Sequence, residues 1–260
     1  MILRRLTQHV KDQNWFAVAL DFVIVVAGVL IALQVSNWNE DRQTRERAGD
    51  LSQRLAEDMR YEAWSYEYLI AYNEDVRASA KATIDALTGD DPLTDEQFLI
   101  NAYRATQYKY NDKNRATFDE LISTGEIGLI ADGRLRTTAI SLFTTDLFDV
   151  IAVEGRGAPI REIFRRQTPA NVQQALLANC GDRFEPAGDY EAIRGSLAYP
   201  CEIGLPPDDL AEAAASLRAD PGLVEALRLR FADLETAITD LEHVNQTVLT
   251  NLREIAGKSP

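Results

Sequence analysis

A long apolar stretch near the N-terminus constrains this chain more than any other feature of its sequence. Residues 15–35 read WFAVALDFVIVVAGVLIALQV, and only Asp21 and Gln34 interrupt the apolar residues. As a helix, this stretch spans about 30 Å, which is the thickness of the hydrocarbon layer of a bilayer. The pattern predicts a transmembrane anchor at residues 15–37, preceded by a basic cytoplasmic flank at residues 1–14.

Two other interpretations of the stretch are a cleaved signal peptide and a buried core helix. A secretory signal has a shorter apolar region and ends in a small-x-small cleavage site. Here the run continues into Gln34-Val35-Ser36-Asn37-Trp38, which offers no good site. A core helix rarely runs this long without more polar residues. We therefore expect an uncleaved signal-anchor in the lipid bilayer.

The basic residues beside the anchor do not decide its orientation alone. Both flanks carry three of them, Arg4, Arg5 and Lys11 on one side and Arg42, Arg45 and Arg47 on the other. Acidic residues contribute little to this rule. The free N-terminal amine and the pair of cysteines favour a cytoplasmic N-terminus. We expect a single-pass protein of a bacterial inner membrane, with residues 38–260 as a periplasmic domain.

One face of the predicted anchor carries Ala17, Asp21, Gly28 and Ala32. Gly28 and Ala32 form a small-x-x-x-small pattern, which lets two membrane helices approach closely. One hypothesis is a membrane-helix interface with a second copy or a partner membrane protein, in which Asp21 bonds across the contact. The alternative is that Asp21 is protonated or reaches water near the cytoplasmic end of the anchor.

Residues 26–40, VAGVLIALQVSNWNE, resemble the signature of a bacterial family of uncharacterised single-pass membrane proteins. Members of that family carry an acidic residue early in the span and then an IGILIALQINNWNE-like run. Asp21 stands at the acidic position, where the family pattern has Glu. Residues 117–130 are similar to the second block of the family, a short helix that ends in a glycine turn. The resemblance implies a membrane anchor with a helical extracytoplasmic region, and it implies no known activity.

The two cysteines, Cys180 and Cys201, bracket a stretch rich in Gly and Pro. If this domain is exported, the natural pairing is a disulfide bond between them. If it is cytosolic, they are two buried thiols. A Cys/His zinc site has too few ligands, because the chain holds only two histidines and no C-x-x-C pair.

The sequence after the anchor predicts an all-α fold. Residues 40–87 lack proline, have no glycine after Gly49, and repeat apolar residues with a helical period, so one long helix is expected to continue out of the membrane. Capping boxes are predicted at Thr94–Gln97 and Thr117–Glu120, a C-terminal cap at Gly125 and an N-terminal cap at Asp132. No strand pattern of convincing length appears. We expect an extracytoplasmic helical bundle.

The last segment has the most regular pattern. Apolar residues alternate at spacings of three and four, with Asn245 as the only polar member: Val224, Leu227, Phe231, Leu234, Ile238, Leu241, Asn245, Val248, Leu252 and Ile255. This spacing is typical of a coiled-coil seam, in which a single Asn often fixes the register. The alternative is that the helix packs on the long N-terminal helix of its own chain in an intramolecular bundle.

The function predicted from these features is non-catalytic. The net charge of −14 disfavours nucleic-acid binding, and no metalloprotease, nucleotide-binding or hydrolase motif occurs. No catalytic residue, metal ligand or cofactor is predicted. Five aromatic residues gather on the long helix and suggest either core packing or a partner surface: Tyr61, Trp64, Tyr66, Tyr68 and Tyr72. We expect an interaction or assembly module of the cell envelope; the alternative is a ligand-sensing ectodomain that acts through a partner membrane protein.

Overall fold

The computed structural model describes residues 15–89, 91–110 and 112–257, without the side chains of residues 15–18 and 21. The predicted cytoplasmic flank at residues 1–14 and the side chains of Ala17 and Asp21 lie outside the described residues. The described part contains helices and turns but no strand, which confirms the all-α prediction. The chain divides into two compact units, residues 1–51 and residues 52–260.

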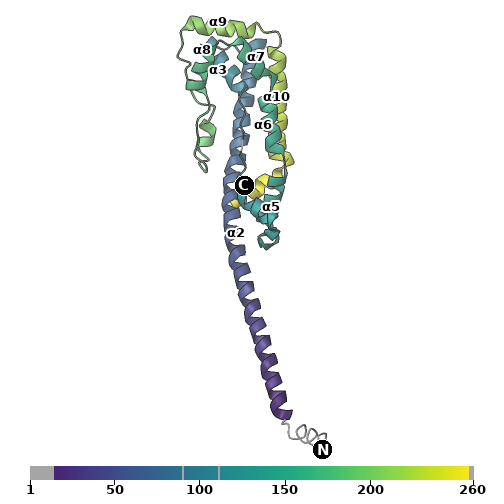
Figure 1. Cartoon of the computed structure of the whole chain (residues 1–260). Coiled ribbons are helices and arrows are strands. Elements are labelled where there is room, and N and C mark those ends of the chain that lie inside the picture. Colours follow the sequence, from purple (N-terminus) through teal and green to yellow (C-terminus); the bar gives the residue numbers. More distant parts are fainter. Residues whose placement is uncertain (1–14, 90, 111, 258–260) are drawn as a thin grey trace, which may run out of the picture. The chain divides into compact units, whose positions relative to one another are not determined.

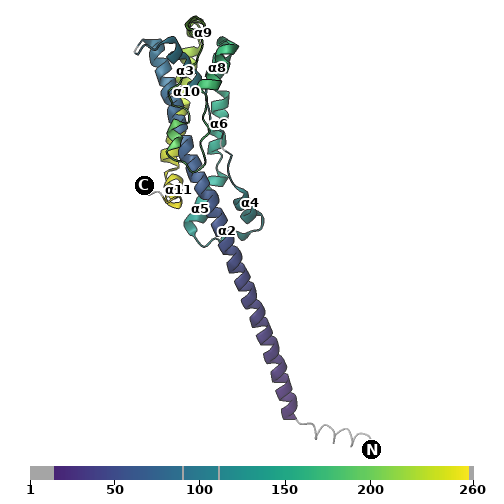
Figure 2. The same cartoon turned by 90° about the vertical axis from the view of Figure 1, so that its left-hand side faces the viewer.

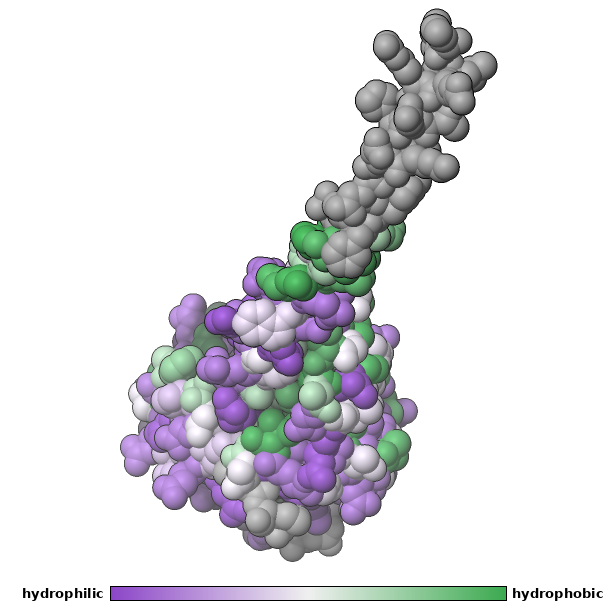
Figure 3. All heavy atoms as spheres, turned by 90° about the horizontal axis from the view of Figure 1, so that it is seen from below, coloured by the Kyte–Doolittle hydropathy of each residue, from purple (hydrophilic) through white to green (hydrophobic). Residues whose placement is uncertain are grey.

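The long helix α2 (Trp15–Thr88) contributes the described residues of the first unit. Near its N-terminus it is, within the described part of the chain, the one helix long and apolar enough to cross a membrane. Its apolar side chains have no protein cover there: Phe22 is 69% exposed and Trp38 is 62% exposed. Figure 3 shows hydrophobic side chains gathered on this helix. Exposure of this much apolar surface to water is unfavourable.

The second unit begins within α2, and its core starts there. Buried residues follow the predicted helical period along its part of α2: Leu55, Met59, Tyr66, Leu69, Val76 and Ala80, with Leu87 partly buried. Residues 38–50 of the helix are almost all exposed, and the second compact unit starts at Ser52.

Shorter helices complete the second unit (Figures 1 and 2). In chain order they are α3 (Asp95–Ala105), α4 (Ala116–Ser123), η1 (Glu126–Leu129), α5 (Gly133–Thr144), α6 (Leu147–Gly157), α7 (Pro159–Gln167), α8 (Ala170–Cys180), η2 (Ala192–Gly195), α9 (Pro207–Arg218), α10 (Leu223–Thr239), η3 (Asp240–Val244) and α11 (Gln246–Ile255). Helices α3, α7, α8 and α9 pack together at one end of this unit, and α11 packs on α5 at the other end.

Three of the four predicted caps are confirmed. The hydroxyl of Thr94 accepts from the backbone N–H of Gln97 at 3.2 Å, and the reciprocal bond completes the capping box of α3. Asp132 accepts from the first N–H groups of α5. Gly125 ends α4 with a φ of 73°, a left-handed conformation that favours glycine.

The predicted capping box at Thr117–Glu120 is wrong. Helix α4 already begins at Ala116, its N-cap residue Arg115 makes no side-chain cap, and Thr117 is buried. The carboxylate of Glu120 instead accepts from Arg54 Nη2 at 2.8 Å. Thr117 is therefore buried and Glu120 forms a long-range ion pair, so neither side chain caps the helix.

The C-terminal heptad pattern packs inside the chain. Its buried members are Leu227, Leu234, Ile238, Leu241 and Leu252, and its partly buried members are Val224, Phe231, Asn245, Val248 and Ile255. Helix α10 packs on α6 and α7, and α11 packs on α5. Leu234 also packs with Trp64 and Tyr72 of the long helix α2. Contacts with α2 are those expected for the intramolecular alternative.

The π-helical turn η3 breaks the heptad register. Its wider turn shifts the following face, so Leu249 is buried and Val248 is only partly so. Asn245 Nδ2 donates to the carbonyl of Asp240 at 2.9 Å and closes this turn. The one polar residue of the predicted seam thus satisfies the backbone of its own helix.

Candidate ligand-binding site

The aromatic patch of α2 is mostly core. Trp64, Tyr66, Tyr68 and Tyr72 are buried, and Tyr61 is partly buried at the edge. The polar atoms of three rings reach distant parts of the chain. Trp64 Nε1 donates to the carbonyl of Asp189 at 3.0 Å, and the hydroxyl groups of Tyr66 and Tyr72 donate to Leu241 O and Asp182 Oδ1, both at 2.8 Å. This patch therefore anchors the loop after α8 and the C-terminal helices to α2.

The amino group of Lys109 lies over two of these rings. Its Nζ is 4.7 Å from the centroid of Tyr68 and 5.3 Å from that of Tyr72, and it pairs with Asp182 at 3.7 Å. A cavity of about 250 Å³ opens beside this contact, with Trp64 and the exposed ring of Phe184 among its walls. Because Lys109 already occupies the cation-binding faces of the rings, this cavity offers little to an external cation.

Two arginines hold the chain where it leaves α3. Arg161 Nη1 donates to the carbonyl of Thr106 at 2.6 Å, and Arg230 Nη2 donates to that of Gln107 at 2.8 Å. Positive groups are favourable at this helix end, where carbonyls lack helical partners. Arg230 is only 3% exposed, and burial lowers the pKa of its guanidinium to about 10, so it stays charged at neutral pH.

A pocket of about 330 Å³ opens on the other side of Arg161, and we name it the α7–α8 pocket. Helix α7 and helix α8 form two walls, and the end of α3 closes the third. The residues that line it are Tyr103, Thr106, Gln107, Arg161, Phe164, Arg165, Gln173, Gln174 and Leu177. Its volume lies at the lower end of the range of about 300–1,000 Å³ that small-molecule sites occupy.

The spacing of α7 places both guanidinium groups at this pocket. Arg161 and Arg165 are four residues apart, one turn of helix, so they share a face. Burial and the like charge of Arg165 lower the pKa of Arg161. On α8, Gln173 Nε2 donates to the carbonyls of Arg165 and Thr168 at 2.9 and 2.7 Å. These two hydrogen bonds fix the side-chain amide of Gln173 and link α8 to α7.

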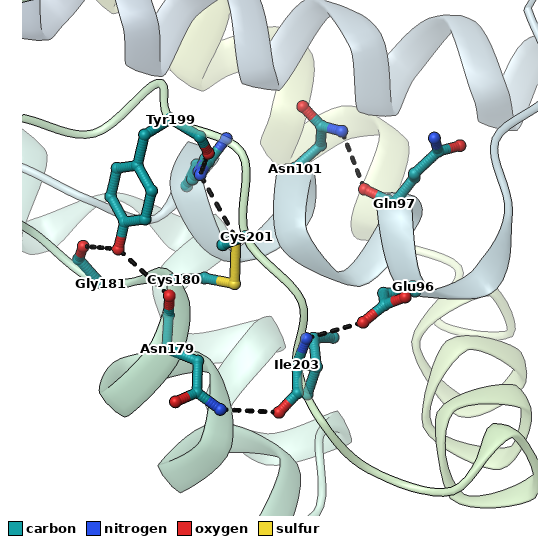
Figure 4. The surroundings of a disulfide bond; sticks show 10 residues. Glu96, Gln97, Asn101, Asn179, Cys180, Gly181, Tyr199, Cys201 and Ile203 are labelled. Atoms are coloured by element: carbon teal, nitrogen blue, oxygen red, sulfur yellow. Dashed lines mark hydrogen bonds between the residues drawn. A yellow bond between two sulfur atoms is a disulfide. The ribbon is translucent and has the colours of Figure 1, made fainter. Parts of the chain in front are cut away.

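The predicted disulfide lies at the C-terminal end of α8, the helix that forms one wall of the pocket (Figure 4). Cys180 ends α8, and its Cα atom lies 5.5 Å from that of Cys201. Asn179 Nδ2 donates to the carbonyl of Ile203 at 2.9 Å, while the N–H of Ile203 donates to Glu96 Oε1 on α3 at 2.7 Å. The segment at residues 201–203 therefore connects α8, which forms a wall of the pocket, to α3.

The described residues contain no metal-binding cluster. No group of three or more His, Cys, Asp or Glu side chains among them is placed to hold a metal ion. His243 lies exposed on η3, far in sequence from the residues that line the pocket. The arrangement at the α7–α8 pocket can bind and orient a ligand through two cations and several amides.

Sequence reasoning located the cysteines and missed the pocket. The structure pairs Cys180 with Cys201, and it leaves Gly28 and Ala32 on the exposed part of α2. The signal for the pocket was the pair Arg161 and Arg165, one turn apart in a strongly acidic chain. Nothing in the sequence shows that α8 faces this pair, because that contact depends on tertiary packing.

The chain matches no family model, no curated protein and no solved structure. The likeness of residues 26–40 to a bacterial membrane-protein family therefore remains a resemblance of sequence.

Proposed function

We propose that this chain is a membrane-anchored, non-catalytic interaction module of the bacterial cell envelope, of the kind that the resemblance of residues 26–40 implies. The first part of α2 acts as a single-pass anchor in the inner membrane, with the N-terminus in the cytoplasm. Residues 38–260 lie in the periplasm. The observation that carries the proposal is the run of exposed apolar side chains on α2, in the same chain as a disulfide-bonded helical domain.

The disulfide supports export of the domain. Bonds of this kind persist in oxidising compartments such as the periplasm and are rare in the cytosol. The bond here joins a buried cysteine, Cys180, to a partly buried one, and it fixes the end of a helix. A disulfide with this structural role must stay oxidised in the folded protein.

The membrane segment supports the interaction role. Gly28 and Ala32 lie one turn apart, and a Cβ atom added at Gly28 would meet no other atom of the chain within 4 Å. The small surface is therefore open to a neighbour in the membrane, either a second copy or a partner membrane protein.

A ligand-sensing ectodomain is the second candidate function, and the α7–α8 pocket favours it. In this candidate function, a signal from the pocket passes through a partner membrane protein.

The location is tested with full-length chains fused at the C-terminus to alkaline phosphatase or to green fluorescent protein. Phosphatase folds to its active form outside the cytoplasm, whereas the fluorescent protein matures inside it. We expect active phosphatase and dark fluorescent protein. Replacement of Arg4, Arg5 and Lys11 by Gln should weaken this bias, because basic residues hold their flank in the cytoplasm. The reverse pattern in the unaltered chain overturns the proposed orientation.

The interaction role is tested by photo-crosslinking in the membranes of the cells that naturally produce the chain. A photoreactive residue at position 28 should form protein adducts. The same residue at position 19, about two and a half turns away and so on the opposite side of the helix, should form mainly lipid adducts. Equal lipid labelling at both positions contradicts a membrane-helix interface.

A further inference from the structure

The α7–α8 pocket has the opposite charge to the chain that contains it. The whole chain carries a net charge of −14. Among the nine residues that line the pocket there are two arginines and neither Asp nor Glu. Two other cavities have carboxylates beside the basic residues of their walls: Asp112 and Glu185 with Lys109 and Arg183 in one, and Asp149 with Arg156 in the other. A local excess of positive charge in an acidic protein attracts a negatively charged ligand.

The two guanidinium groups retain hydrogen-bonding capacity toward the pocket. Among the hydrogen bonds of the described residues, Arg161 commits only Nη1, which donates to the carbonyl of Thr106. Arg165 is exposed, and the structure gives its side chain no ion pair with a described carboxylate. A guanidinium presents five N–H donors in a planar fork that matches the two oxygens of a carboxylate.

The floor of the pocket is aromatic. The buried rings of Tyr103 and Phe164 lie with their centroids 6.0 Å apart. At the rim, the apolar side chain of Leu177 is 68% exposed. A ligand that fills this space therefore gains by placing an apolar group against the rings. An amine or a zwitterionic amino acid fits less well, because no lining carboxylate is present to pair with an ammonium group.

From this combination we propose that the α7–α8 pocket binds a small organic carboxylate with an apolar body. The carboxylate is held by Arg161 and Arg165, and the apolar body lies on Tyr103 and Phe164. The proposal deepens the proposed binding role of the ectodomain and rests on it. It supplies the chemical class of the ligand that a sensing ectodomain would recognise.

A purely structural role explains only one of the two arginines. Arg161 caps the end of α3 through Thr106, and this contact alone would account for its position. The side chain of Arg165 has no such contact among the described residues, and it lines the pocket. The neighbouring Arg166 instead forms ion pairs with Glu162 and Asp220, both at 3.4 Å.

The test is isothermal titration calorimetry of the full-length chain in detergent micelles, with empty micelles as reference. The probes are 3-phenylpropanoate, its neutral amide 3-phenylpropanamide, and inorganic phosphate. We expect saturable binding of the carboxylate and binding of the amide at least ~10-fold weaker, because the amide lacks the charge that the arginines pair with. Phosphate should bind more weakly than the carboxylate, since it has no group for the aromatic floor.

The decisive variant is Arg165→Gln, because Arg165 is exposed and its loss leaves the packing intact. It should weaken carboxylate binding by at least ~10-fold. The matched control, Arg166→Gln, removes the same charge from the same helix and should leave binding within about twofold. Arg161→Gln is a second variant, with circular dichroism as the check that the fold persists.

The proposal is overturned by no saturable binding of the carboxylate, by equal binding of carboxylate and amide, or by equal loss in the Arg165 and Arg166 variants. Tighter binding of phosphate than of the carboxylate also overturns it, because the aromatic floor would then play no part. Calorimetry in micelles does not depend on membrane orientation. If the chain binds the carboxylate but the fusions give the reverse pattern, the ligand proposal stands and the proposed location is wrong.

Discussion

Glu62 is a buried carboxyl group with an incomplete set of hydrogen bonds. It is 0% exposed, and its Oε1 accepts from the backbone N–H of Asn114. Its Oε2 has no partner among the described residues. Burial raises its pKa from 4.5 to about 7, and the nearby carboxylate of Asp58 adds to this effect, whereas Asn114 and Lys113 oppose it.

This raised pKa predicts that stability falls as pH rises. Between pH 4.5 and about 7 the folded state keeps the proton of Glu62, whereas the unfolded chain loses it. The contribution is therefore fully present below pH 4.5 and lost above pH 7. In that window Glu62 lowers the free energy of unfolding by up to about 1.4 kcal/mol per pH unit. Urea unfolding of the full-length chain between pH 5 and pH 8 measures this slope.

The variant Glu62→Gln should remove this part of the slope and should be more stable than the natural chain at pH 8. Its amide oxygen still accepts from Asn114, and it carries no charge to bury. The control Glu57→Gln alters an exposed carboxylate on the same helix and should keep the slope. Parallel slopes in the natural chain and the Glu62 variant would show that this carboxyl does not control the pH dependence.

Gly155 lets the segment after α3 approach α6. A Cβ atom added there would lie 2.6 Å from Tyr108 Cβ and 3.3 Å from Arg230 Nη2. The clash involves the first atom of a side chain, so the backbone of Tyr108 would have to move. Gly155→Ala should therefore lower the free energy of unfolding by about 1–3 kcal/mol, although alanine is the better helix former by about 1 kcal/mol.

Thermal unfolding of two matched variants checks this point. A Cβ atom at Gly157, two residues along the same helix, would meet nothing within 4 Å. Gly157→Ala should be neutral or slightly stabilising, since only helix propensity acts there. If both variants unfold at the same temperature as the natural chain, the close approach at Gly155 carries no energetic weight.

At the scale of elements, the position of α8 depends on the disulfide. This helix has 11 residues and no side-chain cap at its N-terminus, and it buries Val172, Leu176 and Cys180. Cys180 and Cys201 are 21 residues apart, and closing a loop of that length stabilises a chain by about 3 kcal/mol in the loop-entropy estimate. Reduction should therefore lower the free energy of unfolding by a similar amount and weaken ligand binding at the α7–α8 pocket.

Denaturant unfolding with and without a thiol reductant tests the role of the bond. A double variant, Cys180→Ala with Cys201→Ala, should already be destabilised and should no longer respond to the reductant. Unchanged stability of the natural chain under reducing conditions, with free thiols verified by mass spectrometry, would mean that packing alone positions α8.

Helix ends with local causes could be predicted from the sequence. The caps at Thr94 and Asp132 involve residues within three positions of each other, so their pattern is sufficient. The predicted capping box at Thr117–Glu120 was wrong because Glu120 pairs with Arg54, which is remote in sequence. The heptads of the last helix correctly indicated a buried face. The heptad pattern did not predict the contacts with α5, α6 and α7 or the turn at η3, because periodicity shows that a face is apolar and not what packs on it.

The same limit applied to the candidate site. The pairing of Cys180 with Cys201 could be predicted because the chain has no other cysteine. The α7–α8 pocket could not, because its walls come from three helices separated by up to about 70 residues. Two arginines one turn apart are common on exposed helices, and only the tertiary fold brings Tyr103 of α3 to the same pocket.

At the scale of the whole molecule, the apolar residues divide between two different environments. Every buried hydrophobic residue of the described chain lies at Leu51 or later. The hydrophobic residues of α2 from Leu20 to Trp38 are exposed. Residues 1–44 carry four basic and four acidic side chains, so the net charge of −14 belongs to the rest of the chain. The acidic charge favours solubility in water, whereas the exposed apolar helix opposes it.

A chain that begins at Arg45 should therefore be soluble without detergent and should keep its fold. No core side chain is removed, so its thermal midpoint should stay within about 3 °C of that of the full-length chain in the same buffer with detergent. The disulfide and the carboxylate affinity of the pocket should also persist. Circular dichroism melting of both chains measures this comparison. A truncated chain that melts more than about 8 °C lower would mean that residues 1–44 stabilise the helical domain, since a shift of that size corresponds to at least about 2 kcal/mol.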